Sequence, residues 1–426
     1  MKEEKVLKVS RQDIDLMAPV GSFETLHAAI QGGADSVYFG IDRLNMRARS
    51  VYNFTPADLQ KIVRYSKSFN KKTYLTLNVV VYDNEMTRMK EILDRAKEKG
   101  IDAVIASDQA VIQYCRTIGM EVHLSTQLNI SNAETLKFYS SFADVAVLAR
   151  ELDLKKVSAI SEQIIKQKIR GPSGKPIRLE MFVHGALCMS ISGKCYLSLH
   201  NYSKSANRGE CLQDCRKSYT VRENETGFEL DIQNEYILSP KDLSTIHFLN
   251  KIIDAGVQVL KIEGRARSPE YVKVVTETYD LALKSLENGT YNADNLKIWE
   301  SRLTSVFNRG FWDGYYLGQK TAEWSNVYGS NATFRKVYIA KNINYFAKIG
   351  IADFLCEADQ LKTGDQILII GPTTGVVEHT ITEIKVNHSN VEKVLAGDRF
   401  SIPLPVKVRR ADKLYKLVKT KDDYQL

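Results

Sequence analysis

The sequence predicts an α/β protein in which a large (β/α)8 barrel precedes a small C-terminal all-β barrel. Between residues 14 and 307, short apolar and β-branched segments alternate with amphipathic stretches of helix length, a pattern typical of parallel α/β folds. Eight predicted strands that alternate with helices are the elements that a (β/α)8 barrel requires. An open, doubly wound sheet is the alternative, but no G-x-G-x-x-G follows the first predicted strand.

The elements of the barrel are predicted from these periodicities. The eight strands are expected at Ile14–Ala18, Ser36–Phe39, Thr73–Val79, Ala103–Ala106, Glu121–Leu124, Val145–Leu148, Arg178–Val183 and Gln258–Ile262. The helices between them are expected at Phe23–Gly32, Thr55–Phe69, Glu85–Gly100, Gln109–Ile118, Asn132–Ser141 and Leu152–Gln167. A further helix is predicted at Lys241–Ala255, and Pro269–Phe307 is predicted to form closing helices.

After Gly329 the pattern changes to short β-rich runs separated by Gly-Asp turns such as Thr363–Asp365 and Ala396–Asp398. Evenly spaced short strands of this kind indicate a small antiparallel barrel. Residues 1–329 are therefore predicted to form the large barrel, and residues 330–426 a C-terminal β-barrel domain. The segment Leu361–Pro372 resembles barrel modules of translation factors, which favours a role in RNA binding.

Composition points to an ordinary cytoplasmic globular protein. The chain has 426 residues, 44% of them hydrophobic, and a net charge of +8. No apolar run approaches the ~20 residues that span a bilayer, and the N-terminus has no apolar signal core, so we expect no membrane partner.

A basic strip from Lys407 to Lys421 carries seven basic residues and one acid. Two interpretations are open. The strip either binds RNA phosphates, through Arg409, Arg410 and Lys413, or forms a solvated, charged edge strand and tail.

Four of the six cysteines fall in the pattern C-x6-C-x15-C-x3-C, as Cys188, Cys195, Cys211 and Cys215. Four thiolates form a complete ligand set for one iron–sulfur cluster or one zinc ion. The pattern lacks the paired C-x2-C of most structural zinc sites, so a cluster is favoured over zinc and over unligated or disulfide-bonded thiols. Cys115 and Cys356 are expected to be plain buried residues.

These cysteines lie in an unusually long connection, from about His184 to Pro240, that follows the seventh predicted strand. Connections in compact domains are mostly shorter than ~12 residues, and longer ones are usually functional or disordered. This connection is predicted at the C-terminal face of the barrel, where barrel enzymes keep their active sites.

Polar side chains at the ends of the predicted strands should converge on the same face. The candidates for binding a substrate are Arg47, Asn78, Gln127, Arg150 and Arg265, and the candidates for catalysis are Asp108, His184 and Glu263. The planar guanidinium group of arginine pairs with carboxylates through two hydrogen bonds. The recurring arginines therefore indicate either a binding site for an anionic substrate or surface salt bridges. His184 is either an acid–base group or a loop anchor, and Glu263 is expected to pair with Lys261, Arg265 or Arg267.

The sequence can be checked for the motifs of known hydrolases. The sequence has no H-E-x-x-H and no G-x-S-x-G. Cys188 and His184 would make a nucleophilic dyad, but a dyad does not require three further cysteines nearby, whereas a cluster does.

The segment Glu180–Ser198, EMFVHGALCMSISGKCYLS, resembles the signature of the collagenase-like peptidases of unassigned catalytic type, peptidase family U32. Agreeing stretches include Met17–Ser22, Gly33–Gly40, Leu124–Asn129, Leu260–Arg265 and Asn308–Phe311. Within that family, the length and the C-terminal domain most resemble the tRNA hydroxylation proteins of the P type.

This resemblance implies prephenate-dependent 5-hydroxylation of the wobble uridine of tRNA, with tRNA and the co-substrate prephenate as partners. Hydroxylation moves electrons, which an iron–sulfur cluster, expected as 4Fe–4S, is able to supply. The resemblance also allows a homo- or hetero-oligomer with a paralogous barrel. The alternatives are a collagenase-like protease, hydroxylation of ribosomal RNA, and an accessory protein of ubiquinone hydroxylation.

Overall fold

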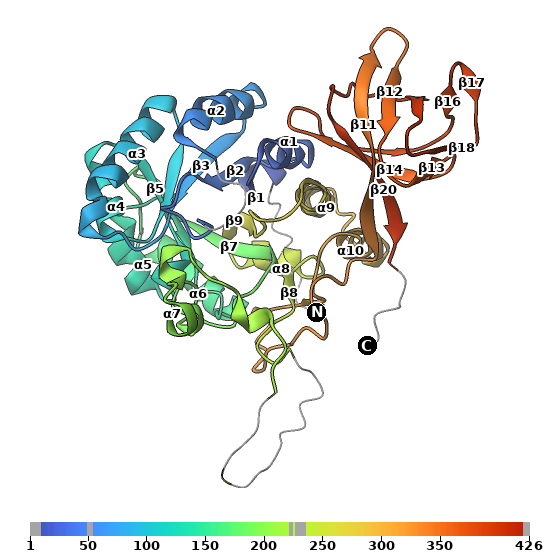
Figure 1. Ribbon diagram of the computed structural model, residues 1–426. Helices are drawn as coiled ribbons and strands as arrows, with labels where there is room; N and C mark the ends of the chain where they lie inside the picture. Colours follow the sequence, from blue (N-terminus) through green and yellow to red (C-terminus); the bar gives the residue numbers. More distant parts are fainter. Residues whose placement is uncertain (1–9, 49–53, 221–224, 226–235, 421–426) are drawn as a thin grey trace.

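The computed structural model describes residues 10–48, 54–220, 225 and 236–420. A closed ring of parallel strands forms its centre (Figure 1). They are β1 (Asp15–Pro19), β2 (Ser36–Gly40), β3 (Lys72–Leu77), β4 (Ala103–Ala106), β5 (Glu121–Leu124), β6 (Val145–Val147), β7 (Arg178–Gly185) and β9 (Val257–Ile262). They pair in this order, and β9 pairs with β1 to close the barrel. The predicted (β/α)8 barrel and its eight strands are confirmed.

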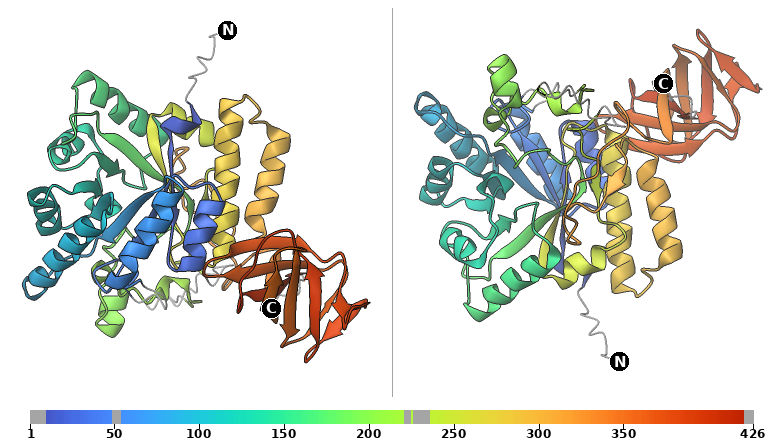
Figure 2. Two further views of the ribbon diagram at one scale, coloured as in Figure 1. Left: turned by 90° about the horizontal axis from the view of Figure 1, so that it is seen from above. Right: turned by 90° about the horizontal axis from the view of Figure 1, so that it is seen from below.

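Helices surround the barrel (Figure 2). They are α1 (Phe23–Gln31), α2 (Leu59–Ser68), α3 (Met86–Lys99), α4 (Gln109–Thr117), α5 (Ala133–Ser140), α6 (Leu154–Lys166), α8 (Leu249–Asp254), α9 (Pro269–Glu287) and α10 (Ala293–Thr304). The buried residues Met89, Ile92, Leu93 and Ala96 of α3 recur at helical spacing, so one face of the helix covers the strands. The helix ends at Gly100, whose φ of 78° glycine adopts without strain.

The prediction of one helix at Lys241–Ala255 is wrong in its first half. Residues Asp242–Ser244 form β8, which pairs antiparallel with β7 and parallel with β10 (Phe311–Trp312). β7 continues to Gly185, so its last residues offer backbone groups that β8 satisfies. Tertiary pairing therefore overrides local helix preference here, and α8 begins only at Leu249.

The long connection after β7 contains α7 (Leu197–Tyr202) and 3-10 turns at Ala206–Arg208 and Asp214–Arg216. It is fastened to the connection after β3, where the N–H of Val80 donates to the carbonyl of Asn207 at 3.2 Å.

The C-terminal region is antiparallel and all-β, as predicted. Its strands are β11 (Phe334–Phe346), β12 (Ile351–Cys356), β13 (Gln360–Lys362), β14 (Gln366–Gly371), β15 (Gly375–Thr380), β16 (Lys385–Val386), β17 (Ser389–Asn390), β18 (Lys393–Leu395), β19 (Arg399–Pro403) and β20 (Lys413–Lys419). The region has its own apolar core, in which Phe354 and Phe400 stack at 5.6 Å between ring centroids.

The basic strip does not form an edge strand. β20 lies between β14 and β11 in the sheet, and Lys416 forms an ion pair with Asp365 at 2.8 Å. Arg409, Arg410 and Lys413 are exposed, while Lys421 lies outside the described residues.

The C-terminal region packs against α1 and α9 (Figure 2). The side-chain amide of Gln31 donates to the carbonyl of Thr374 at 3.0 Å and accepts from the N–H of Val376 at 2.9 Å. Gly375 has a φ of 69°, which glycine adopts without strain, so the turn beside Gln31 favours glycine here. None of the described helices is long and apolar enough to cross a membrane.

Candidate functional site

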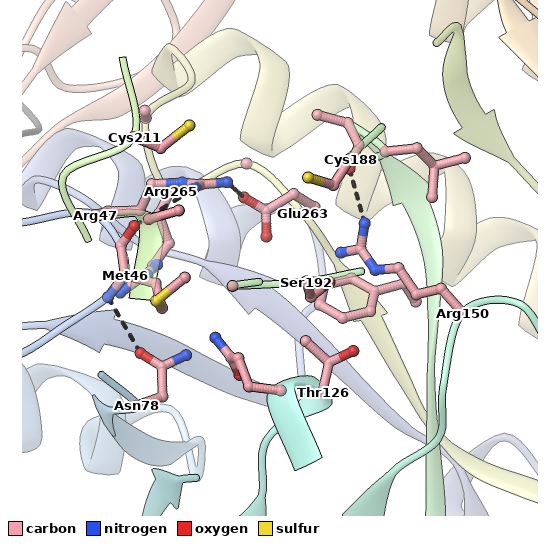
Figure 3. Close-up of a pocket in the computed structure, with 18 of the residues that line it drawn as sticks. Met46, Arg47, Asn78, Thr126, Arg150, Cys188, Ser192, Cys211, Glu263 and Arg265 are labelled. Atoms are coloured by element: carbon pink, nitrogen blue, oxygen red, sulfur yellow. Dashed lines mark hydrogen bonds and ion pairs between the residues drawn. The ribbon is translucent and has the colours of Figure 1, made fainter. Parts of the chain in front are cut away.

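A pocket of about 230 Å³ opens at the C-terminal ends of the barrel strands, beneath the long connection after β7. All four clustered cysteines line it, and so do the predicted substrate-binding residues Arg47, Asn78, Gln127, Arg150 and Arg265, together with Glu263. In the view of Figure 3, Cys188 and Cys211 lie on one side of Glu263, and Asn78 and Thr126 lie on the other.

Specific contacts hold the cysteine-bearing connection over the pocket. The guanidinium of Arg216 donates to the carbonyls of Leu187 at 2.6 Å and Pro240 at 2.7 Å, so it ties the two ends of the connection together. Gly209 has a φ of 73°, and a Cβ there would lie 2.2 Å from the carbonyl oxygen of Asn45. Only glycine allows so close an approach to the connection after β2.

The four clustered cysteines form a donor set of the kind that an iron–sulfur cluster or a zinc ion requires. The four cysteines are free thiols around one cavity, and Cys188, Cys195 and Cys211 are near enough to raise the pKa of Cys215, although burial raises it more. Yet no three His, Cys, Asp or Glu side chains among the described residues are grouped to hold one ion.

The pocket is strongly cationic. Seven basic side chains line it, namely Arg47, Arg150, Arg216, Lys261, Arg265, Arg267 and Arg309. Glu263 is the one acidic side chain among the described lining residues. Such an excess favours anionic ligands because the walls exclude water and screen charge poorly.

Glu263 pairs with Arg47, at 2.7 Å between Oε1 and Nη2, and not with Lys261, Arg265 or Arg267 as predicted. Burial would raise the pKa of Glu263, but Arg47, Arg265 and Arg150 outweigh it and lower this pKa to about 2. Glu263 is therefore ionised at neutral pH, where it holds Arg47 in place and has no proton to donate.

Arg150 and Arg265 carry charges that no carboxylate within the described part of the chain neutralises through an ion pair. Arg150 lies over the ring of Phe182, 3.8 Å from its centroid, and donates to the carbonyl of Ala186 at 3.1 Å. Its Nε is buried without a partner. Arg265 donates to Thr76 Oγ1 at 2.6 Å, and burial lowers the pKa of Arg265 to about 10. Arg265 is buried and Arg150 is half-buried, and guanidinium groups that form no ion pair suit the carboxylates of a small ligand.

Asn78 and Gln127 are joined through Ser125. The amide of Asn78 donates to Ser125 Oγ at 3.3 Å, and Ser125 donates to the side-chain carbonyl of Gln127. The Asn78 oxygen also accepts from the N–H of Met46 at 3.2 Å (Figure 3). This chain fixes a neutral polar wall of the pocket.

Two of the predicted catalytic residues do not line the pocket. Asp108 caps α4 and accepts from the N–H groups of Ala110 at 2.9 Å and Val81 at 3.0 Å. His184 is only 1% exposed and is packed against Tyr271, Tyr279 and Phe311. Burial, and then Arg267, lower the pKa of His184 to about 3. Asp108 joins two loops, and His184 is a neutral part of the core.

This burial of His184 should make the protein sensitive to acid. The folded protein resists protonating His184 above pH about 3, whereas the unfolded chain takes up that proton near pH 6.5. Stability is therefore complete above pH 6.5 and is lost as pH falls from there towards 3, by roughly 2 kcal/mol between pH 7 and pH 5. Urea unfolding at both pH values should show a smaller difference for His184→Gln. An unchanged difference would mean that His184 protonates without penalty in the folded state.

Sequence reasoning gave Lys261 no part in the pocket, and it did not single out Arg216. Lys261 donates to Glu180 at 2.7 Å and lies 4.7 Å from the ring centroid of Tyr38, with both charged side chains buried. A lysine between the apolar residues Leu260 and Ile262 of a predicted strand was the available signal. Arg216 gave no such signal because its role depends on the path of the long connection.

The fold and the pocket together define a (β/α)8 barrel protein with a thiol-lined, cationic cavity at its C-terminal face. The family model described as peptidase family U32 matches residues 21–326, and the chain belongs to that family. It is 56% identical to a collagenase of Porphyromonas gingivalis over 410 residues, 96% of this chain and 99% of the relative. It is 30% identical to tRNA hydroxylation protein P1 of Bacillus subtilis over 378 residues, 87% of this chain and 86% of the relative. It is 26% identical to tRNA hydroxylation protein P of Escherichia coli, with 92% and 93% covered.

Proposed function

We propose that this protein takes part in tRNA modification as a prephenate-dependent 5-hydroxylase of the wobble uridine, with an iron–sulfur cluster held by Cys188, Cys195, Cys211 and Cys215. The observation that supports this proposal is that four thiols and two guanidinium groups that form no ion pair within the described chain share one cavity. Relatives named for tRNA hydroxylation match most of the chain.

The pocket residues suit this chemistry. Hydroxylation replaces the C5–H bond of uridine with C5–OH and removes two electrons from the base, so an oxygen donor that is reduced by two electrons has to take part. A bound cluster would transfer electrons between the two. Arg150 and Arg265 would bind the two carboxylates of prephenate, since guanidinium groups pair with carboxylates through parallel hydrogen bonds. The Arg47–Glu263 pair and the polar wall from Asn78 to Gln127 would orient the ligand between them.

A peptidase is the second candidate, because the relative that is 56% identical is named collagenase. Covalent peptide hydrolysis needs a nucleophile beside a general base. None of the described residues that line the pocket is a histidine, and His184 lies in the core. Glu263, with its pKa lowered to about 2, is a weak base. The geometry therefore favours the hydroxylation proposal.

Nucleoside mass spectrometry of tRNA tests the proposal. Deleting the gene should remove the nucleosides derived from 5-hydroxyuridine at the wobble position, and blocking prephenate synthesis should have the same effect. An unchanged tRNA profile together with a lost peptidase activity would support the second candidate. Loss of a ribosomal RNA hydroxylation would move the activity to that substrate.

The C-terminal region is expected to contribute to tRNA binding. Replacing Arg409, Arg410 and Lys413 together by alanine should weaken tRNA affinity and reduce the slope of log affinity against log salt by roughly 2–3 units. The three side chains are exposed and do not line the pocket, so turnover at saturating tRNA should remain. An unchanged salt slope would show that this strip does not contact the RNA backbone.

A further inference from the structure

The rim of the pocket carries an unusual concentration of exposed apolar side chains. Eighteen large hydrophobic residues are exposed in the described chain, and seven of them fall in only two short segments. These seven, which we call the rim patch, are Val80, Tyr82, Met189, Ile191, Tyr196, Leu199 and Tyr202. Exposed apolar side chains that gather in one region of a surface usually mark an interaction site.

The two segments of the rim patch are joined to each other and to the pocket. Arg208, in the connection after β7, forms an ion pair with Glu85 and lies 4.3 Å from the ring centroid of Tyr82. Ser198 of α7 accepts from the N–H of Leu212, next to Cys211, at 2.9 Å. Met189 belongs both to the rim patch and to the lining of the pocket. One member of the patch, Met189, therefore lies at the mouth of the cavity, and the others lie in the two connections that are fastened to each other beside it.

The three tyrosines of the patch are highly exposed, at 54% for Tyr82, 73% for Tyr196 and 47% for Tyr202. Basic side chains accompany them. Arg208 lies over Tyr82, and the Lys217 ammonium lies 5.4 Å from the ring centroid of Tyr202. The segment from Cys188 to Lys217 carries five basic residues and two acids.

This combination favours nucleic acid over protein. Tyrosine, methionine and arginine are also common at the centres of protein–protein interfaces, but lysine is depleted there, and this segment carries Lys194, Lys204 and Lys217. Single-stranded RNA is bound instead by aromatic rings on which bases stack, with cations that follow the phosphates. Exposed tyrosines beside lysine and arginine therefore match an RNA strand.

We propose that the rim patch is a stacking platform for single-stranded RNA, which holds the nucleotides that flank a base inserted into the pocket. This inference rests on the proposed function for the identity of the inserted base. RNA would then contact the mouth of the barrel as well as the C-terminal region. An enzyme that acts on a base has to take it out of the stack, and platform residues at the mouth stabilise the neighbouring bases that lose a partner.

The test is fluorescence anisotropy of a labelled anticodon stem–loop with the full-length protein. Tyr82→Ala, Tyr196→Ala and Tyr202→Ala should each weaken binding by about 5- to 150-fold, while Tyr→Phe at the same positions should keep most of the affinity. The slope of log affinity against log salt should not change in these variants. Replacing Lys194 and Lys204 by alanine should instead lower that slope by about 1.4, at ~0.7 per contact with a single strand.

Matched controls come from α5, where Phe138 is 65% exposed and Lys137 is also exposed, and neither lines the pocket. Phe138→Ala and Lys137→Ala should bind like the unmodified protein. Each rim variant should keep the iron content and thermal unfolding of the unmodified protein if the substitution removes only the stacking ring. A lower iron content would mean that the substitution disturbs the neighbouring cysteines.

The outcomes distinguish this inference from the proposed function. Unchanged affinity in all three tyrosine variants would overturn the platform, whatever nucleoside the protein modifies. Variants that bind RNA normally but lose a protein partner in gel filtration would also overturn it and assign the patch to a protein interface. Weakened RNA binding together with an unchanged tRNA nucleoside profile in the deletion strain would support the platform and reject wobble-uridine hydroxylation.

Discussion

Replacing any one of Cys188, Cys195, Cys211 and Cys215 by alanine is expected to lower the iron content sharply and abolish the activity. A cluster bound by four thiolates is destabilised when one ligand is lost, and the long connection would lose the centre that the four residues enclose. Iron content, labile sulfide and tRNA hydroxylation in a complemented deletion strain measure the two effects.

Cys115 and Cys356 provide the matched controls. Both are buried, and burial raises the pKa of Cys115 to about 12, so this thiol is inert. Alanine at either position should leave iron content and activity near those of the unmodified protein. If Cys188 alone were essential and all variants contained equal iron, the cluster proposal would be rejected and Cys188 would instead act as a nucleophile.

Arg150→Ala is expected to reduce turnover by roughly 100- to 1,000-fold or more, while tRNA affinity stays nearly the same. The removed guanidinium is held in place by the ring of Phe182 and the carbonyl of Ala186, and the loss of a preorganised charge contact with the ligand is costly. Arg150→Lys should restore little activity, because an ammonium group keeps the charge but not the planar fork that grips a carboxylate. Steady-state kinetics with varied prephenate would show the loss in turnover, in prephenate binding or in both.

Two controls accompany this prediction. Arg150 also donates to the carbonyl of Ala186, close to Cys188, so the iron content of the variant has to be normal before its kinetics are interpreted. Arg302→Ala removes an arginine paired with Glu277 away from the pocket and should be neutral. Full activity of Arg150→Ala would show that this arginine does not bind the co-substrate.

The barrel was predictable because the buried strands and amphipathic helices leave different apolar periods in the sequence. The location of the cysteines was also predictable, since a long connection after the seventh strand can only lie at the C-terminal face. Lys241–Ala255 was mistaken for one helix because β8 is created by its pairing with the extended end of β7, which local sequence does not reveal.

The individual roles of pocket residues were harder to predict, since chain order does not give the direction of a side chain. His184 lies near the end of β7, but its ring packs against Tyr271 and Tyr279. Burial among these rings lowers its pKa and keeps it neutral. Glu263 is neighboured in sequence by Lys261 and Arg265, yet its partner Arg47 is 216 residues away. Pairings of this kind depend on the closed barrel and become visible only in three dimensions.

The most direct test of the account is the metal content of the full-length protein purified without oxygen. The protein should contain iron and acid-labile sulfide in equal amounts and show the visible absorption of an iron–sulfur cluster, which should disappear in the four cysteine variants. A colourless preparation that contains no iron after anaerobic purification and reconstitution, yet cleaves peptides, would contradict it.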